Sequence, residues 1–425
     1  MEKKSYKIHI IGAGVSGLIA AKVLEDNGYH PIIIEASNRV GGRVKTDVID
    51  GYQLDHGFQV LLDAYPQAQK YLDFNALELQ KFVPGATIFT DGKRSTIGDP
   101  LRDWSLLFST LSSSIGTIGD KLKILKLNST LKKISIETIF SSPETTTLSY
   151  LESKGFSEDI INKFYKPFFA GIFLEPQLNT SSRMFKFVYK MFGEGHAVLP
   201  KAGIEAIPRY LQKQLKQTSI RFNTKVTAVN DDHLVLENGD KIRTHFSIIA
   251  TEASHLIPNL KQTTKWKSCD NLYFTMETRA IDKPIIGLIS DRNALINNLF
   301  FHSSLNTASE TERELLSVTI VKNHNLDEKR LIENVQIELE KLCGISNTHF
   351  LKRYQITKAL PELNNLQYDC SPTETQLKPT IFLAGDQQLN GSLNAAMLSG
   401  QRAAEGLILA LEDGLRVEEL TSEYL

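Results

Sequence analysis

Cysteine is scarce in this sequence, and neither sign of charge is in marked excess. The three cysteines among 425 residues are Cys269, Cys343 and Cys370, and no CxxC pair occurs. Their number and spacing exclude a disulfide framework and a cysteine-rich zinc site, and they favour a reducing, cytoplasmic compartment. The formal net charge is −1. A chain with so little net charge has no general attraction for nucleic acid or for an anionic membrane.

Long apolar runs and export signals are absent as well. No stretch of about 18 uninterrupted apolar residues occurs, so the sequence predicts no transmembrane helix. The N-terminal segment MEKKSYKIHI enters an expected strand without an apolar signal core or a small-residue cleavage site. The motif HExxH, the P-loop, the serine nucleophile elbow and paired catalytic carboxylates are also missing. The sequence therefore indicates none of those catalytic classes, and we expect no metal site.

What the sequence does contain is an ordered βαβ pattern near its N-terminus. An apolar strand at 7–11 runs into GAGVSG, and a helix is expected over 18–24. A second apolar strand then ends at Glu35. The complete order of strand, glycines, helix, strand and acid is typical of a dinucleotide-binding unit. A glycine-rich turn without a ligand is the alternative interpretation.

Each conspicuous residue of this unit has a physical role in such a site. Gly12 permits the tight turn, Gly14 lets the backbone approach a pyrophosphate, and Gly17 allows the helix to pack closely on the strand. The free N–H groups and the dipole of the helix N-terminus attract phosphate. The carboxylate of Glu35 can accept hydrogen bonds from ribose hydroxyls and would repel a 2′-phosphate.

A second glycine motif follows at once, in the segment ASNRVGGR that contains Arg39, Gly42 and Arg43. It resembles the second glycine motif of the superfamily of FAD-dependent amine oxidases, phytoene desaturases and protoporphyrinogen oxidases. In that superfamily the glycine pair and its arginine wrap around the FAD pyrophosphate. The next segment, GYQLDHGFQVL, is similar to the part that those proteins place beside the flavin, and it holds His56 and Gly57. The resemblance implies FAD, bound non-covalently, as the cofactor.

Two further segments carry the same resemblance. Residues 381–404 read as an apolar strand, then Gly385-Asp386, then a small-residue turn that opens a helix. In the superfamily the aspartate contacts the ribityl and pyrophosphate region of FAD, and the helix dipole stabilises negative charge at flavin N1 and O2. Residues 195–253 resemble the part that completes the FAD domain. A helix over 199–215 and three short strands are expected there, with a hairpin turn at Asn238-Gly239.

Carried over residue by residue, the resemblance implies one set of FAD-binding positions spread along the chain. No catalytic residue is assigned, because the flavin itself accepts the hydride. The implied FAD-binding residues are Gly12, Ala13, Gly14, Val15, Ser16, Gly17, Glu35, Ala36, Arg39, Gly42, Arg43, His56, Gly57, Phe58, Val226, Ala250, Thr251, Gly385, Asp386, Ser392, Leu393, Asn394 and Ala395.

The chain order implies a discontinuous fold. We expect an α/β protein with a Rossmann-type, glutathione-reductase-like FAD-binding domain formed by residues 1–80, 195–255 and 373–425. The inserts 81–194 and 256–372 are expected to form an α+β substrate-binding domain. The first insert is mainly helical in pattern, and the second alternates strands with a helix. This composition suits a sheet that forms one wall of a substrate cavity.

Two features of the first insert have two interpretations each. Apolar residues from Trp104 to Ile118 follow helical spacing and precede a lysine-rich stretch that ends at Lys133. This stripe indicates either a membrane-docking surface over 104–133 or a core-facing helix, and its interrupting serines favour the second. Aromatic residues gather between Phe164 and Phe173, either as the lining of a cavity or as core.

Candidates for chemistry beyond the flavin are few. His56 and His196 are each more typical of structural histidines than of catalytic ones. Many amine oxidases keep a lysine near flavin N5, on a strand of the substrate domain. The matching strand, SCDNLYFTME, carries Asn271 but no lysine, with Lys265 and Lys267 just upstream. This difference disfavours oxidation of a simple amine.

Three functions remain open. The first is an oxidoreductase that takes a hydride from a C–H bond of a lipophilic small molecule, as desaturases do. The second is an amine oxidase, and the third is a lipid-binding protein of the GDP-dissociation-inhibitor type without redox chemistry. The intact glycine motif, Glu35 and Gly385-Asp386 favour an enzyme. The electron acceptor stays open, as does peripheral membrane contact of a cytoplasmic protein.

Overall fold

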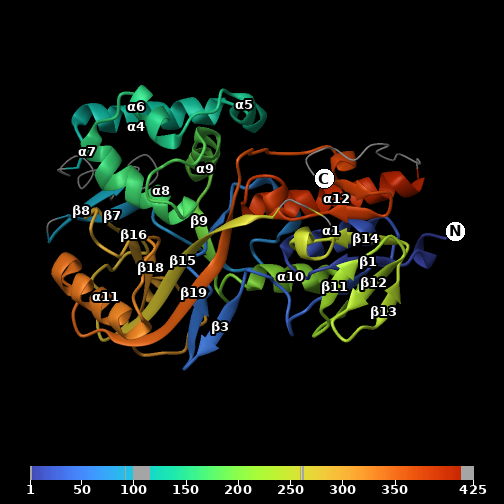
Figure 1. Cartoon of the computed structure of the whole chain (residues 1–425). Helices are drawn as coiled ribbons and strands as arrows, with labels where there is room; N and C mark the ends of the chain where they lie inside the picture. The colour runs from blue at the N-terminus through green and yellow to red at the C-terminus, as the bar shows by residue number, and fades with distance from the viewer. Residues whose placement is uncertain (1, 91, 99–114, 259, 261–262, 413–425) are drawn as a thin grey trace.

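Two large sheets with helices packed around them make up the molecule (Figure 1). The computed structural model describes residues 2–90, 92–98, 115–258, 260 and 263–412. The α-helices are α1 (Val15–Asp26), α2 (Pro66–Tyr71), α4 (Ile118–Lys133), α5 (Ile136–Ser141), α6 (Thr147–Ser153), α7 (Glu158–Ile160), α8 (Lys166–Phe173), α9 (Ser182–Glu194), α10 (Ala206–Gln214), α11 (Glu328–Cys343) and α12 (Leu393–Glu412). One π-helical turn, η3 (Ile161–Tyr165), joins α7 to α8.

The six-stranded sheet draws its strands from segments far apart in the chain. Its order is β10 (Ser219–Arg221), β2 (Ile32–Ile34), β1 (Ile8–Ile11), β14 (Phe246–Ile249), β21 (Ile381–Leu383) and β20 (Gln376–Lys378). The first five strands are parallel, and β20 runs antiparallel to β21. Every residue of β1 is buried, as a parallel strand covered on both faces requires.

The seven-stranded sheet also combines distant segments. Its order is β19 (His349–Glu362), β15 (Lys265–Met276), β18 (Glu314–Ile320), β17 (Asn298–Phe301), β16 (Ile286–Ile289), β7 (Gly85–Thr90) and β8 (Lys93–Gly98). Only β16 and β7 pair in parallel. Helix α11 supports this sheet, because Leu331, Val335 and Leu339 form one fully buried stripe along it. Figure 1 shows helices α4 to α9 gathered on one side of the sheet.

Three small sheets complete the fold. A meander joins β11 (Val226–Val229), β12 (His233–Leu236) and β13 (Lys241–Arg243), and a hairpin pairs β3 (Thr46–Ile49) with β4 (Tyr52–Asp55). The third consists of β5 (Leu61–Leu62), β9 (Ala197–Pro200) and β6 (Leu79–Lys81). The hairpin lies beside β19 (Figure 1), and the hydroxyl of Tyr354 on β19 donates a hydrogen bond to Asp47 on β3.

Close contact between α1 and α12 fixes the first glycine motif to the C-terminal motif. A Cβ atom on Gly400 of α12 would overlap the carbonyl oxygen of Ser16 in α1. A Cβ on Gly17 would likewise overlap the carbonyl oxygen of Gly12. These two glycines therefore permit backbone-to-backbone approach, which is the packing role that the sequence predicts for Gly17.

The structure differs from the sequence-based expectations in several places. The helix expected over 199–215 begins only at Ala206, as α10, because Ala197–Pro200 form strand β9. The single strand expected over 241–251 is divided into two strands. Strand β13 joins the meander, and β14 joins the six-stranded sheet. The first insert contributes strands β7 and β8 as well as helices. Most of the apolar stripe from Trp104 lies outside the described residues. Of its later members, Ile115 is buried, whereas Ile118 begins α4 and is 78% exposed.

Candidate active site

One cavity of about 1730 Å³ connects the glycine turn after β1 with helix α4. Pockets for small ligands usually measure about 300–1,000 Å³. This cavity is therefore large enough for a cofactor and a second molecule together. Its lining comes from both large sheets and from the helices of the first insert.

Most of the residues implied as FAD-binding meet at this cavity. Those that line it are Gly12, Gly14, Val15, Ser16, Glu35, Gly42, Arg43, His56, Gly57, Phe58, Ala250, Thr251, Gly385, Asp386, Ser392 and Leu393. The others do not line it: Ala13, Gly17, Ala36, Arg39, Val226, Asn394 and Ala395. Their contacts are with the surrounding protein, as Gly17 and Arg39 illustrate.

The two glycine motifs form one continuous cradle. Gly12 has a φ of +105°, a left-handed conformation that favours glycine at this turn. A Cβ on Gly14 would meet no protein atom within 4 Å, so the space in front of this residue is open. The N–H of Gly41 donates to the carbonyl of Ala13 at 2.9 Å, which holds the second motif against the first. Open space in front of the backbone at a helix N-terminus is what the approach of a pyrophosphate requires.

Glu35 follows β2 at the edge of the cradle. Its carboxylate accepts hydrogen bonds from Ala13 N at 2.7 Å and from Ser37 N at 2.8 Å. The Ser37 hydroxyl donates a third at 2.7 Å. These bonds fix the carboxylate at the cavity wall and leave lone pairs for hydroxyl donors. The site thus suits a ribose whose 2′- and 3′-hydroxyls are free.

We expect Glu35→Gln to weaken FAD binding roughly 5- to 150-fold, since a charge-assisted hydrogen bond to ribose is worth about 1–3 kcal/mol. Glutamine keeps an acceptor oxygen for only one of the two backbone N–H groups that Glu35 binds through separate oxygens, so circular dichroism should accompany the measurement to report the fold. Titration of the cofactor-free protein with FAD, followed by flavin fluorescence, measures the change. Glu237→Gln is the matched control, because that carboxylate pairs with Lys225 at the surface. Equal affinities for both variants would contradict the ribose assignment.

The C-terminal motif places one ion pair at the opposite wall. Arg43 pairs with the buried carboxylate of Asp386, and its guanidinium also lies 5.0 Å from the ring of Trp266. Helix α12 begins just beyond, where the Ser392 hydroxyl accepts a hydrogen bond from Ala395 N at 3.0 Å. The first residues of α12 therefore face the cavity with the positive end of the helix dipole.

The far end of the cavity is aromatic. Phe164, Phe168, Phe169 and Phe173 line it, whereas Tyr165 between them is fully buried and does not. Both interpretations of the aromatic run therefore hold: its phenylalanines line the cavity, and Tyr165 belongs to the core. An apolar compartment of this kind accepts the hydrocarbon part of a substrate.

The structure corrects the position of the lysines relative to the expected strand. Strand β15 begins at Lys265 and thus includes both lysines. Lys267 lines the cavity, where its ammonium donates to the carbonyl of Phe173 at 3.0 Å. Burial lowers the pKa of Lys267 below its ordinary value. An expected strand that started at Lys265 would have included Lys267. The two lysines are two residues apart, as side chains on one face of a strand are.

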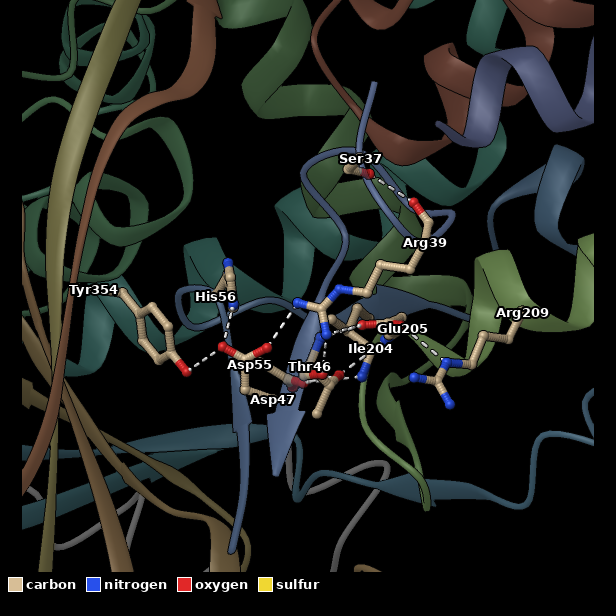
Figure 2. A network of polar contacts seen from close by, with 10 residues as sticks. All are labelled: Ser37, Arg39, Thr46, Asp47, Asp55, His56, Ile204, Glu205, Arg209 and Tyr354. Carbon is tan, nitrogen blue, oxygen red and sulfur yellow. Dashed lines mark hydrogen bonds and ion pairs between the residues drawn. The ribbon is translucent and has the colours of Figure 1, made fainter. Parts of the chain in front are cut away.

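A polar network that no local sequence pattern indicates adjoins the cavity wall at His56 and Tyr354, and Figure 2 shows its members. Asp47 of β3 accepts hydrogen bonds from Arg39 at 2.7 Å, from His56 Nε2 at 2.8 Å and from the Tyr354 hydroxyl at 2.9 Å. His56 and Tyr354 both line the cavity. Arg39, implied above as an FAD-binding residue, is thus directed to Asp47 and Glu205 instead.

Two more buried carboxylates extend this network. Glu205 accepts hydrogen bonds from Thr46 N at 2.9 Å and from Arg209 Nε at 2.8 Å. Asp55 accepts from the Thr46 hydroxyl at 2.5 Å, and complete burial raises its pKa to about 6. These groups hold the β3–β4 hairpin in place, and Asp47 joins them to His56 and Tyr354 at the cavity.

His196 also reaches the cavity, from the loop before β9. Its backbone N–H donates to Asp63 at 2.5 Å, and its ring Nδ1 lies 3.5 Å from the same carboxylate. Within the described ranges, no group of three or more His, Cys, Asp or Glu side chains is arranged to hold a metal ion. A search of the same residues finds no helix long and apolar enough to cross a membrane.

Comparison with known proteins places the chain among flavoenzymes. The model of the family described as flavin containing amine oxidoreductase matches residues 15–408. Hydroxysqualene dehydroxylase of Zymomonas mobilis is 23% identical, over 93% of this chain and 98% of its own length. Protoporphyrinogen oxidase 2 of Arabidopsis thaliana is 26% identical over 39% of this chain, and this match spans only 32% of the plant protein.

Solved structures agree on the fold. Putrescine oxidase bound to putrescine superposes with a TM-score of 0.71, over 95% of this chain and 99% of that protein, at 16% sequence identity. A likeness at this identity demonstrates a shared architecture of sheets and helices.

Proposed function

Because the chain belongs to the flavin-containing amine oxidoreductases, a family of FAD-dependent enzymes, we propose that it oxidises a lipophilic small molecule by removing a hydride from a C–H bond. The continuous cavity carries this proposal. One end is a glycine cradle with phosphate-binding geometry, and the other end is walled by phenylalanines. A cofactor and an apolar substrate fit side by side in such a space.

FAD would be held by the residues that line the cradle end. The six-stranded sheet would then be the core of a Rossmann-type domain, made from residues 1–80, 195–255 and 373–425. Glu35 would accept hydrogen bonds from the ribose, and the backbone after β1 would bind the pyrophosphate. The start of α12 would stabilise negative charge near the flavin. When bound, FAD supplies the hydride acceptor, and the protein supplies orientation and electrostatics.

Two observations support a lipophilic substrate. One relative that spans nearly the full chain is a hydroxysqualene dehydroxylase, whose name refers to a hydrocarbon-rich substrate. In the present structure, Ile118, Leu122 and Leu125 of α4 are exposed by 78%, 63% and 37%, and all three line the cavity. They follow helical spacing and therefore form one apolar strip at its mouth.

This strip would be a contact with a bilayer, through which a lipophile enters the cavity. Lys126, Lys132 and Lys133 are exposed on the same helix, and cations there attract anionic headgroups. The contact proposed from the sequence over 104–133 would thus centre on α4. Its residues up to 114 lie outside the described part of the chain.

We expect squalene or a porphyrinogen, supplied anaerobically in phosphatidylcholine liposomes, to bleach the flavin faster than butylamine does. Leu122→Glu should slow bleaching by the liposomal compounds, since a buried charge opposes contact with the bilayer. The same variant should retain normal bleaching by the same compounds in detergent, which serves as its control. Rapid bleaching by the amine alone would contradict the proposal.

Amine oxidation is the second candidate, and Lys267 favours it. A lysine on the matching strand belongs to the pattern of many amine oxidases, and here its ammonium borders the cavity. The bleaching comparison decides between the two. The family match favours either enzyme over a lipid-binding protein without redox chemistry.

A further inference from the structure

His56 stands at the meeting point of three elements of the cavity wall. It follows strand β4, its ring lies 4.4 Å from the ring of Tyr354 on β19, and its Nε2 contacts Asp47 on β3 at 2.8 Å. Figure 2 shows the other ring nitrogen pointing away from Asp47. Among the described residues, Asp47 is the only hydrogen-bond partner of this imidazole.

Asp47 is held in its ionised form. Burial alone would raise its pKa, but hydrogen bonds from Arg39, His56 and Tyr354 outweigh burial and lower the pKa to about 2. An ionised carboxylate accepts hydrogen bonds and cannot donate them. The proton between Asp47 and His56 therefore belongs to Nε2, and Nδ1 of the neutral ring carries a lone pair.

Charged and polar groups from two elements pack against His56 or lie behind its partner. The groups packed against it are Asp47 from the hairpin and Tyr354 from β19, while Arg39 and Glu205 lie behind Asp47. Arg39 is shared between Asp47 and Glu205, and Arg209 also pairs with Glu205, so Asp47 is the carboxylate in direct contact with the imidazole. This is the arrangement by which an aspartate orients a histidine and stabilises its cation in a hydrolase triad.

From this geometry we propose that His56 accepts the proton that substrate oxidation releases, with Asp47 as its positioning residue. The inference rests on the proposed function. In the oxidation of an H–C–X–H unit, the C–H bond gives its hydrogen and electron pair to the cofactor as a hydride. The X–H bond gives its proton to His56 Nδ1, and its electron pair forms the new C=X bond. The proton then leaves to solvent when the ring returns to its neutral form.

The first test compares variants by anaerobic bleaching with whichever compound of the panel reduces the wild-type flavin. His56→Gln keeps a donor for Asp47 but has no titratable nitrogen, and it should slow bleaching by roughly 10²–10⁴-fold. The wild-type bleaching rate should rise as the pH increases through the pKa of one group. This pH dependence should be absent from the His56→Gln variant. His245→Gln, at the surface away from the cavity, is the matched control.

The second test needs no substrate, so it separates this inference from the proposed function. In ¹⁵N NMR spectra of the FAD-loaded protein, His56 should carry its proton on Nε2 at neutral pH, and Nδ1 should bind the second proton as pH falls. Asp47→Asn can donate to Nε2 and should shift the ring toward the other tautomer. A wild-type ring protonated on Nδ1 would overturn the inference, as would His56→Gln with an unchanged rate and pH profile.

A soluble amine as the active compound would contradict the lipophilic substrate and leave the test of His56 intact. Tyr354→Phe keeps the ring contact and removes only the hydrogen bond to Asp47. It should alter the pH at which the bleaching rate rises. If the network had a purely structural role, Asp47→Asn would not change the tautomer of His56, and Tyr354→Phe would not change the pH dependence of the rate.

Discussion

Gly14→Val is expected to yield a folded protein that retains no FAD. The backbone at Gly14 has φ −70° and ψ 176°, which any residue adopts, and an added Cβ would meet no protein atom within 4 Å. Valine therefore strains nothing in the cofactor-free fold. Its methyl groups would occupy the open space of the cradle, where the pyrophosphate of FAD must approach the backbone.

The measurement compares flavin absorbance with protein absorbance after purification, and circular dichroism reports the fold. Gly14→Ala adds a single methyl group and is expected to lower occupancy to an intermediate level. A Gly14→Val protein that remains as yellow as the wild type would refute the assignment of this turn to the cofactor.

Gly400→Ala is expected to lower the free energy of unfolding by about 1–3 kcal/mol, the usual effect of overpacking a tight contact. The added methyl group would overlap the carbonyl oxygen of Ser16, so helices α1 and α12 must separate. Because these helices carry the two motifs at the cradle, FAD occupancy should fall as well. The midpoint of denaturant unfolding, measured with and without excess FAD, reports both effects.

Gly119→Ala in helix α4 provides the comparison for a helical glycine without a close neighbour. Its Cβ would lie 3.4 Å from the Thr117 hydroxyl, an ordinary contact. Alanine is the better helix former, so this variant should be as stable as the wild type or slightly more stable. Equal losses at positions 119 and 400 would show that packing between α1 and α12 is not the cause.

The sequence was sufficient to predict the family and many of the residues that line the cavity. The glycine turn after β1, Glu35 and the Gly385-Asp386 motif are local patterns, in which each residue type is dictated by what the backbone or a phosphate needs. The recognition of an FAD-dependent amine oxidase family is confirmed by the match over residues 15–408. The assignment of individual residues to the cofactor stays a prediction.

Features that depend on long-range pairing could not be predicted in the same way. Tyr354 meets Asp47 across 307 positions of sequence, and no local pattern indicates that contact. Arg39 lies in the second glycine motif, yet its guanidinium turns to Asp47 once the hairpin is folded. The start of β15 at Lys265 likewise depends on its pairing with β19, where Lys265 is opposite Glu362.

The order of strands in the six-stranded sheet also determines when the protein can acquire its cofactor during synthesis. Strand β1 lies between β2 and β14. The other neighbour of β14 is β21, which is synthesised some 370 residues after β1. Asp386 and the first turn of α12 emerge later still. A nascent chain therefore carries the N-terminal cradle without the wall that completes it until the C-terminal motif has been synthesised. The cavity takes its complete form only when segments more than 350 residues apart in the sequence, such as Gly14 and Asp386, have both emerged.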